Sequence, residues 1–112
     1  MATIKYTGDP VRPDMRRLRT WLVDLVLAHL LVRGEASVAE VTIYASKYYN
    51  VNPEVLEADV AAELEKLVLG GLAIKVNGRY KIRRDKVSDL TIERLRELGL
   101  IDKGQAGKLG LY

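Results

Sequence analysis

Six basic side chains lie within the twelve residues from 75 to 86 of this 112-residue chain. They are Lys75, Arg79, Lys81, Arg83, Arg84 and Lys86. Alternate residues of an extended segment share one face, and a row of cations on such a face is suited to contact the phosphates of a nucleic acid. The alternative interpretation is a solvated strand face that protects a sheet edge against aggregation. We favour the phosphate contact.

A second basic cluster lies near the N-terminus, ahead of a predicted helix. It consists of Arg12, Arg16, Arg17 and Arg19. Cations at the start of a helix oppose the helix dipole, so a purely structural role is disfavoured, although ordinary solubilising charge is the alternative. If that helix starts on the side of the first cluster, both clusters could grip one DNA duplex.

Several kinds of chemistry lack the residues they need. The chain has no Cys and one His, His29, which we interpret as a hydrogen-bonded core residue rather than a metal ligand. It has no Gly-rich phosphate loop and no nucleophile elbow. We therefore expect no catalytic residue, metal or cofactor, and a protein that is not an enzyme.

Composition and charge give the broad class of the protein. The chain has no secretory signal and no apolar run long enough to span a membrane, which predicts a cytoplasmic protein. Few Asn and Gln and no Cys resemble the usage of hyperthermophiles. Residues 1–33 carry six basic and three acidic side chains, residues 34–69 two and seven, and residues 70–112 ten and five. A polyanionic partner should therefore meet the two ends of the chain.

Residues 1–13 are expected to form an N-terminal arm, because Gly and Pro break any helix there. Asp14 then caps a first helix over 15–32, which is apolar nearly all round and must be covered on two sides. Either a C-terminal helix covers the second side, or another copy of the chain does. A homodimer would use Trp21, Leu25 and Leu31.

Two further helices follow with a tight turn between them. Ser37 and Glu40 have the spacing of a capping box at the start of the second helix. Asn52 and Pro53 suit the start of the third helix, which should end near Leu69 because Gly70 and Gly71 follow it. The expected inner stripes are Val38, Val41, Ala45 and Tyr48 in the second helix, and Leu56, Val60, Leu64 and Leu67 in the third.

A β-hairpin and a last helix complete the expected domain. A three-residue loop of residues 76–78 would pair Lys75 with Arg79, and Ile74 with Tyr80. All apolar residues of the hairpin would then face the core and all its cations would face outward. The last helix is expected over 88–98, with Leu90, Leu95 and Leu98 facing inward. Residues 102–112 read as a flexible tail.

Residues 37–83 resemble the winged helix-turn-helix superfamily. The matching segments are Ser37 to Val41, Asn50 to Pro53, Leu64 to Leu67, Gly71-Leu72 and Gly78 to Ile82. The resemblance implies a mainly α fold with a small β-hairpin: a winged helix domain over 14–101, with a long N-terminal helix and an extra C-terminal helix. It also implies a DNA-binding protein, a transcriptional regulator or a chromatin-associated protein, whose third helix enters the major groove and whose hairpin, the wing, contacts phosphates.

The third helix departs from that chemistry because its outer face is acidic. Asn52 at its start, and Asn77 at the hairpin tip, are the amides available to contact DNA. Carboxylates near phosphates are repelled, so DNA binding should depend on the hairpin and N-terminal cations. The alternative is an adaptor that binds a basic protein partner through Glu54, Glu57 and Glu65.

Overall fold

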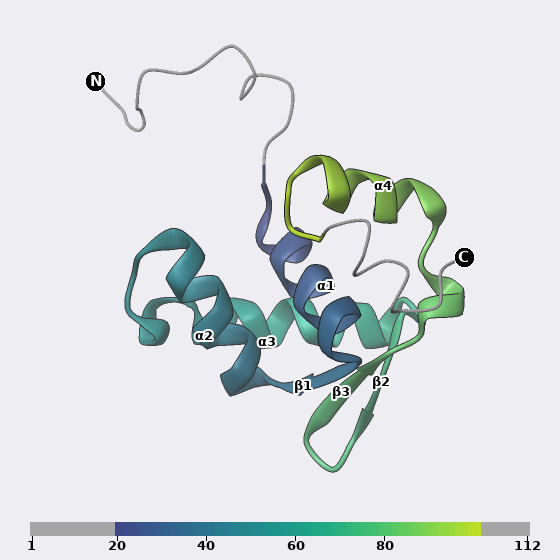
Figure 1. Ribbon diagram of the computed structural model, residues 1–112. Helices are drawn as coiled ribbons and strands as arrows, with labels where there is room; N and C mark the ends of the chain where they lie inside the picture. Colours follow the sequence, from purple (N-terminus) through teal and green to yellow (C-terminus); the bar gives the residue numbers. More distant parts are fainter. Residues whose placement is uncertain (1–19, 102–112) are drawn as a thin grey trace.

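The computed structural model describes residues 20–101. This part of the chain is mainly helical, with four α-helices and one small three-stranded antiparallel sheet (Figure 1). The elements are α1 (Leu22–Arg33), β1 (Glu35–Ser37), α2 (Val38–Tyr49), α3 (Pro53–Leu69), β2 (Ala73–Val76), β3 (Arg79–Ile82), the 3₁₀ turn η2 (Arg84–Lys86) and α4 (Asp89–Glu97). The expected arm, residues 1–13, and the expected tail, residues 102–112, lie outside the described residues, as does the capping position Asp14.

Helix α1 starts later than the apolar pattern suggested. Trp21 has an extended backbone and is the N-cap residue, so the expected helical conformation at residues 20 and 21 is wrong. The reason is local: the carboxylate of Asp24 accepts the Trp21 backbone N–H at 2.7 Å, which fixes the start of the helix at Leu22.

Helices α2 and α3 form as their start and stop residues predict. The Ser37 hydroxyl accepts the Glu40 N–H at 3.2 Å, and Glu40 accepts the Ser37 N–H at 3.0 Å, which confirms the capping box. Asn52 occupies the N-cap of α3, but its side chain makes no capping bond. Most of both inner stripes is buried or half-buried, whereas Tyr48 is exposed and donates its hydroxyl to Thr20 Oγ1 at 3.1 Å.

The sheet contains a strand that the sequence did not predict. Strand β1 pairs with β3, so the order across the sheet is β1-β3-β2. Ala36 lies opposite Tyr80 and is fully buried. The hairpin is therefore joined to the region between α1 and α2, which fixes its position on the helices.

The expected three-residue hairpin loop is wrong. Strand β2 pairs with β3 so that Val76 lies opposite Arg79 and Lys75 opposite Tyr80, which leaves a two-residue loop. Asn77 and Gly78 both have positive φ angles, 51° and 76°, as a type I′ turn requires. The backbone twist of this turn matches the right-handed twist of the strands. The turn geometry therefore determines the register, although the predicted register would separate the apolar residues from the basic residues more completely.

The register change redistributes the hairpin side chains. Ala73, Tyr80 and Ile82 are buried, while Ile74 and Val76 are exposed. The predicted inward position of Ile74 is therefore wrong, and so is the predicted common face of the cations. A two-residue loop places Lys75 on the same face as Tyr80, and Arg79 and Lys81 on the other.

Helix α4 supplies the cover that α1 needs. Its Ile92 and Leu95, together with Ile101, join the same buried cluster as the α1 residues. Leu25 and Leu31 are fully buried within one chain, so they offer no surface to a second copy, whereas Trp21 is 53% exposed. Dimerisation stays a prediction. Within α4, Leu90 is 83% exposed, so its expected inward position is wrong.

Candidate nucleic-acid interface and ligand groove

The structure divides the basic hairpin cluster among three environments. Lys75 lies on the α3 side of the sheet, where its ammonium is 3.2 Å from Glu65 Oε2 and 5.3 Å from the centre of the Tyr80 ring. Glu65 also accepts the Tyr80 hydroxyl. These bonds lower the pKa of Glu65, with the Tyr80 hydroxyl contributing most, and raise that of Lys75. Lys75 and Glu65 thus neutralise each other across the hairpin and α3.

Arg79 lies on the opposite side of the sheet and is held by two carboxylates. Its Nε is 3.0 Å from Glu35 Oε2, and its Nη2 is 3.1 Å from Glu40 Oε1. The pKa of Arg79 is raised by these bonds, that to Glu35 first. The pKa of Glu40 is lowered, first by the Ser37 backbone N–H and then by Arg79. Arg79 therefore links β3 to β1 and α2, and its charge is offset.

Three cations remain together at the base of the hairpin. Lys81, Arg83 and Arg84 line a shallow hollow of about 370 Å³, with Ile74, Ile82 and Asp85. Arg83 lies 3.8 Å from Asp85, a long ion pair. Within residues 20–101, no carboxylate pairs with Lys81, Arg84 or the neighbouring Lys86, all of which are exposed. We call this hollow the hairpin-base hollow. Of the predicted basic cluster, the cations around it are the least compensated by carboxylates, because Lys75 and Arg79 are paired with Glu65, Glu35 and Glu40.

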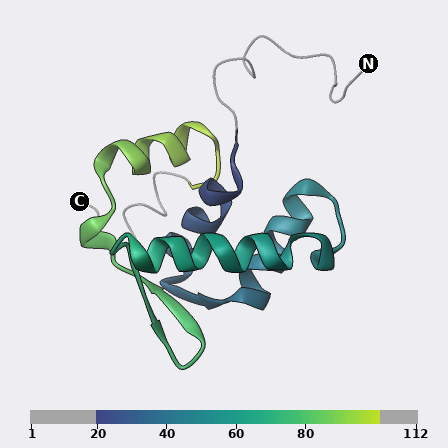
Figure 2. The same cartoon turned by 180° about the vertical axis from the view of Figure 1, so that it is seen from behind.

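The outer surface of α3 is acidic, as the sequence predicts. Helix α3 lies at the back of the molecule in the view of Figure 1 and nearest the viewer in Figure 2. Glu54, Glu57 and Asp59 are exposed and make no ion pair with any described residue, whereas Glu63 is paired with Lys66 at 3.6 Å. Asn52 and Asn77 are exposed at opposite ends of this region, the start of α3 and the hairpin tip. The predicted N-terminal cations, Arg12, Arg16, Arg17 and Arg19, lie outside the described residues.

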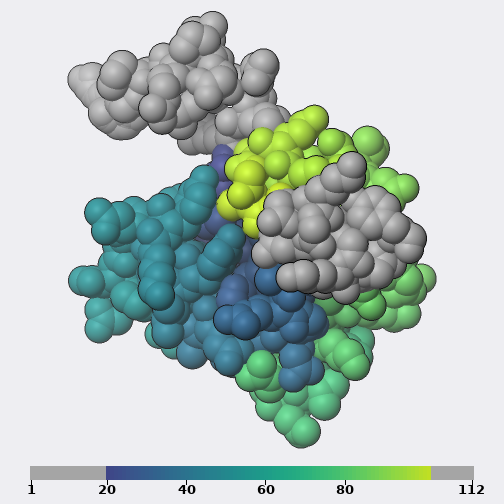
Figure 3. Space-filling view, in the orientation of Figure 1, coloured from purple at the N-terminus to yellow at the C-terminus, as the bar shows by residue number. Residues whose placement is uncertain are grey.

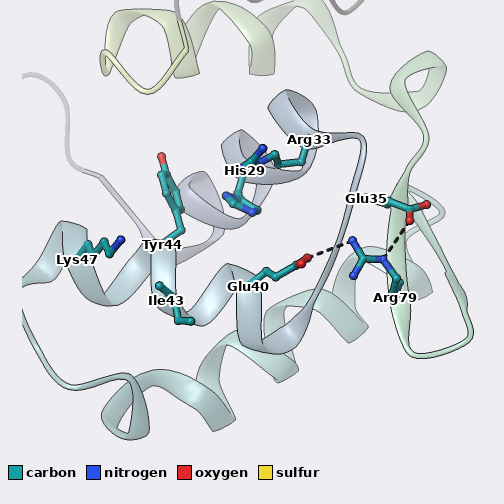
Figure 4. Close-up of a pocket in the computed structure, with 8 residues that line it drawn as sticks. All are labelled: His29, Arg33, Glu35, Glu40, Ile43, Tyr44, Lys47 and Arg79. Atoms are coloured by element: carbon teal, nitrogen blue, oxygen red, sulfur yellow. Dashed lines mark hydrogen bonds and ion pairs between the residues drawn. The ribbon is translucent and has the colours of Figure 1, made fainter.

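A groove on the other side of the molecule was not predicted. Residues one turn apart on α1, His29 and Arg33, face a stripe of α2 that contains Glu40, Ile43, Tyr44 and Lys47. Glu35 and Arg79 complete the lining of this hollow of about 600 Å³, here called the α1–α2 groove. In Figure 4, the rings of Tyr44 and His29 lie between Lys47 on one side and Arg33 and Arg79 on the other.

The groove combines aromatic rings with positive charge. The His29 and Tyr44 rings are 5.0 Å apart between their centres and tilted by 40°. Partial burial lowers the pKa of His29, and Arg33 lowers it further against the opposing effect of Glu40. Arg33 and Lys47 have no carboxylate partner among the residues that the structure covers. Arg79 with Glu35 and Glu40 carries one net negative charge, and Arg33 and Lys47 add two positive charges, so the formal charge of the groove lining is +1.

The sequence carried a weak sign of this groove. Polar and aromatic residues recur at helical spacing on one face of α1 and on one face of α2. They are His29 and Arg33 in α1, and Glu40, Tyr44 and Lys47 in α2. Nothing in either pattern says that the two faces oppose each other, and we interpreted His29 as a core residue. It is instead half-buried, in the wall of the groove.

Two other features are absent from residues 20–101. No group of three His, Asp or Glu side chains is arranged to bind a metal ion there. No helix in that range is both long enough and apolar enough to cross a membrane. No protein-family model, curated protein or solved structure matches this chain.

The tyrosines give a prediction for alkaline pH. Burial is the main cause that raises the pKa values of Tyr80, Tyr44 and Tyr49 above 10, the ordinary value. The folded chain then keeps protons that the unfolded chain releases, so stability should fall as the pH rises above about 10. Thermal unfolding at pH 8, 10 and 11 would measure this loss, and Tyr80→Phe should reduce its slope. A melting temperature independent of pH over that range would contradict it.

Proposed function

We propose that this chain is a winged-helix domain that binds double-stranded DNA through its basic hairpin, with modest sequence specificity, in a transcriptional or chromatin role. The observation that carries the proposal is the hairpin-base hollow, where Lys81, Arg83 and Arg84 converge with little acidic compensation. Phosphate oxygens are the natural partners of such converging cations.

The arrangement of the elements supports the winged-helix assignment. The order α1-β1-α2-α3-β2-β3 and the strand order β1-β3-β2 are those of a helix-turn-helix followed by a wing that is tied back to the first connection. The C-terminal helix α4 is an addition that completes the core around α1.

The charge distribution supports a duplex gripped by the hairpin rather than read by α3. The carboxylates Glu54, Glu57 and Asp59 would face the phosphates if α3 entered a major groove, and each would be repelled. Lys75 and Arg79 are already paired with carboxylates, so we assign the phosphate contacts to Lys81, Arg84 and Lys86, with Arg83 beside them.

The test is fluorescence anisotropy of a labelled random-sequence duplex, titrated with the full chain at several salt concentrations. Wild-type binding should weaken steeply with salt. The double variant K81A/R84A should bind more weakly, and its slope of log affinity against log salt should be smaller by about 1.8, since each phosphate contact contributes about 0.9.

The matched control removes a cation elsewhere. Lys66 lies on α3 and is exposed, so K66A removes the same charge as K81A without touching the hairpin. We expect K66A to keep the wild-type slope. Absence of binding at low salt, or equal slopes for K81A/R84A and K66A, would refute the phosphate grip.

A second candidate function rests on the acidic face of α3. Glu54 and Glu57 are exposed without a cation partner in the described range, and such a surface suits a basic protein partner. A pull-down with the full chain should then recover one partner in equimolar amount, and E54K/E57K should lose it. Glu65 is left unchanged in this variant because Lys75 and Tyr80 hold it.

A further inference from the structure

We propose that the α1–α2 groove is a binding site for a small aromatic anion, a flat ring system that carries a carboxylate. The site is separate from the hairpin-base hollow and does not depend on the proposed DNA binding. The lining runs from Lys47 at one end to Arg79 with its two carboxylates at the other (Figure 4).

The size of the groove suits a small ligand. Its volume of about 600 Å³ falls within the range typical of ligand sites, but five of its eight lining residues are charged, so it is more polar than most such sites and suits a charged ligand. Ile43 and Tyr44 both line the groove, and Ile43 is half exposed. The Tyr44 ring, beside the His29 ring, offers a face on which a flat ring can pack.

The charges of the groove favour an anion. Both carboxylates in the lining, Glu35 and Glu40, are held by Arg79, and the three cations of the lining outnumber them by one. Arg33 and Lys47 remain without such a partner in the described chain and stand on either side of the rings (Figure 4). A ligand carboxylate beside Arg33 could accept two parallel hydrogen bonds from its guanidinium, the strongest pairing open to an anion here.

In the space-filling view, atoms of α2 and of the segment from α1 to β1 lie side by side on the face turned to the viewer, with α4 above them and the hairpin below (Figure 3). Helix α3 lies on the opposite side of the molecule, nearest the viewer in Figure 2. The groove is therefore remote from the acidic surface of α3, and its positive charge is not offset by that surface.

The test uses His29, which is the only histidine in the chain and so gives a single imidazole signal in NMR spectra. The full chain is titrated with 2-naphthoate, with the neutral isostere 2-naphthamide, and with inorganic phosphate. We expect 2-naphthoate to shift the His29 signal in a saturable way, with a dissociation constant on the order of 1 mM for a probe of this size. A bound carboxylate should also raise the pKa of His29, because a nearby anion favours the imidazolium.

Two comparisons isolate the claimed contacts. The amide probe should bind at least tenfold more weakly than the carboxylate, and phosphate should shift His29 little because it lacks a ring. The variant R33Q/K47Q should weaken 2-naphthoate binding at least tenfold, while K66Q, on α3, should leave it unchanged; unchanged backbone amide spectra show that each variant folds.

Each contrary result overturns the proposal. Equal binding of the amide and the carboxylate would reveal apolar adhesion without anion recognition. Wild-type affinity in R33Q/K47Q would place the anion elsewhere, and no saturable shift of His29 would exclude the groove. Because no DNA is present, these results are independent of those from the duplex titration.

Discussion

Replacing Tyr80 with alanine should lower the free energy of unfolding by about 4 kcal/mol, the usual cost of removing a large buried aromatic side chain. Tyr80 is only 2% exposed and lies in the central strand β3, opposite Ala36 on one side and Lys75 on the other. Its ring fills the space between the sheet and α3, and its hydroxyl donates to Glu65. The loss would leave a cavity at the junction of three elements. Urea unfolding followed by circular dichroism measures the change.

Tyr80→Phe separates the ring from the hydroxyl. Phenylalanine keeps the packing and loses one hydrogen bond to a charged group, so a loss of about 1.5 kcal/mol is expected. The contrast between the two variants tests the hairpin register. In the register first expected from the sequence, Ile74 would lie opposite Tyr80 and be buried with it, and Ile74→Ala would cost nearly as much as Tyr80→Ala. In the observed register Ile74 is exposed, so Ile74→Ala should cost less than about 1 kcal/mol.

The helices could be predicted because their signals are local. Ser37 and Glu40 bond to each other's backbone, and Pro53 starts α3 whatever the rest of the chain does. Val60 and Leu64 lie one turn apart and are both buried, as their spacing predicts.

The sheet could not be predicted in full because its stability is not local. Strand β1 has three residues, and it exists because β3 pairs with it from more than forty residues away. The predicted hairpin register is wrong because it requires all the cations of the hairpin to face outward together. Lys75 shows why that requirement fails: it shares a face with the buried Tyr80, and its ammonium lies over the Tyr80 ring and still reaches Glu65.

The sequence predicts which residue types form the candidate sites, but it does not predict which side chains pair with each other there. The run from Lys81 to Arg84 marks a basic surface in the sequence, and it is one in the structure. That Arg79 is held by Glu35 and Glu40 could not be read from residues 44 and 39 positions away. The α1–α2 groove depends in the same way on how two helices meet.

The second large effect is expected from the ion pair between α1 and α4, in which the Asp24 carboxylate is buried and the Arg94 side chain is 33% exposed. Asp24 is only 4% exposed, and its carboxylate accepts Arg94 Nε at 3.1 Å and Arg94 Nη2 at 2.9 Å. The pKa of Arg94 is raised by this contact. Asp24 also accepts the Trp21 N–H, so one side chain both starts α1 and holds α4.

Asp24→Ala should therefore lower the free energy of unfolding by about 3 kcal/mol, because charge-assisted bonds and a capping bond are lost together. For a domain of this size the melting temperature should fall by more than about 10 °C. Asp24→Asn keeps the shape and one acceptor for the Trp21 N–H, so a smaller loss is expected from it. Differential scanning calorimetry of the two variants measures both changes.

Hydrogen exchange then shows where the stability is lost. If the ion pair holds α4 against α1, amides of α4 should exchange faster in Asp24→Ala than in the wild type, by a larger factor than amides of α2. Equal acceleration throughout the chain would mean that Asp24 acts only through the start of α1. Unchanged stability would mean that the attraction within the pair merely offsets the cost of burying the carboxylate, as happens for some buried ion pairs.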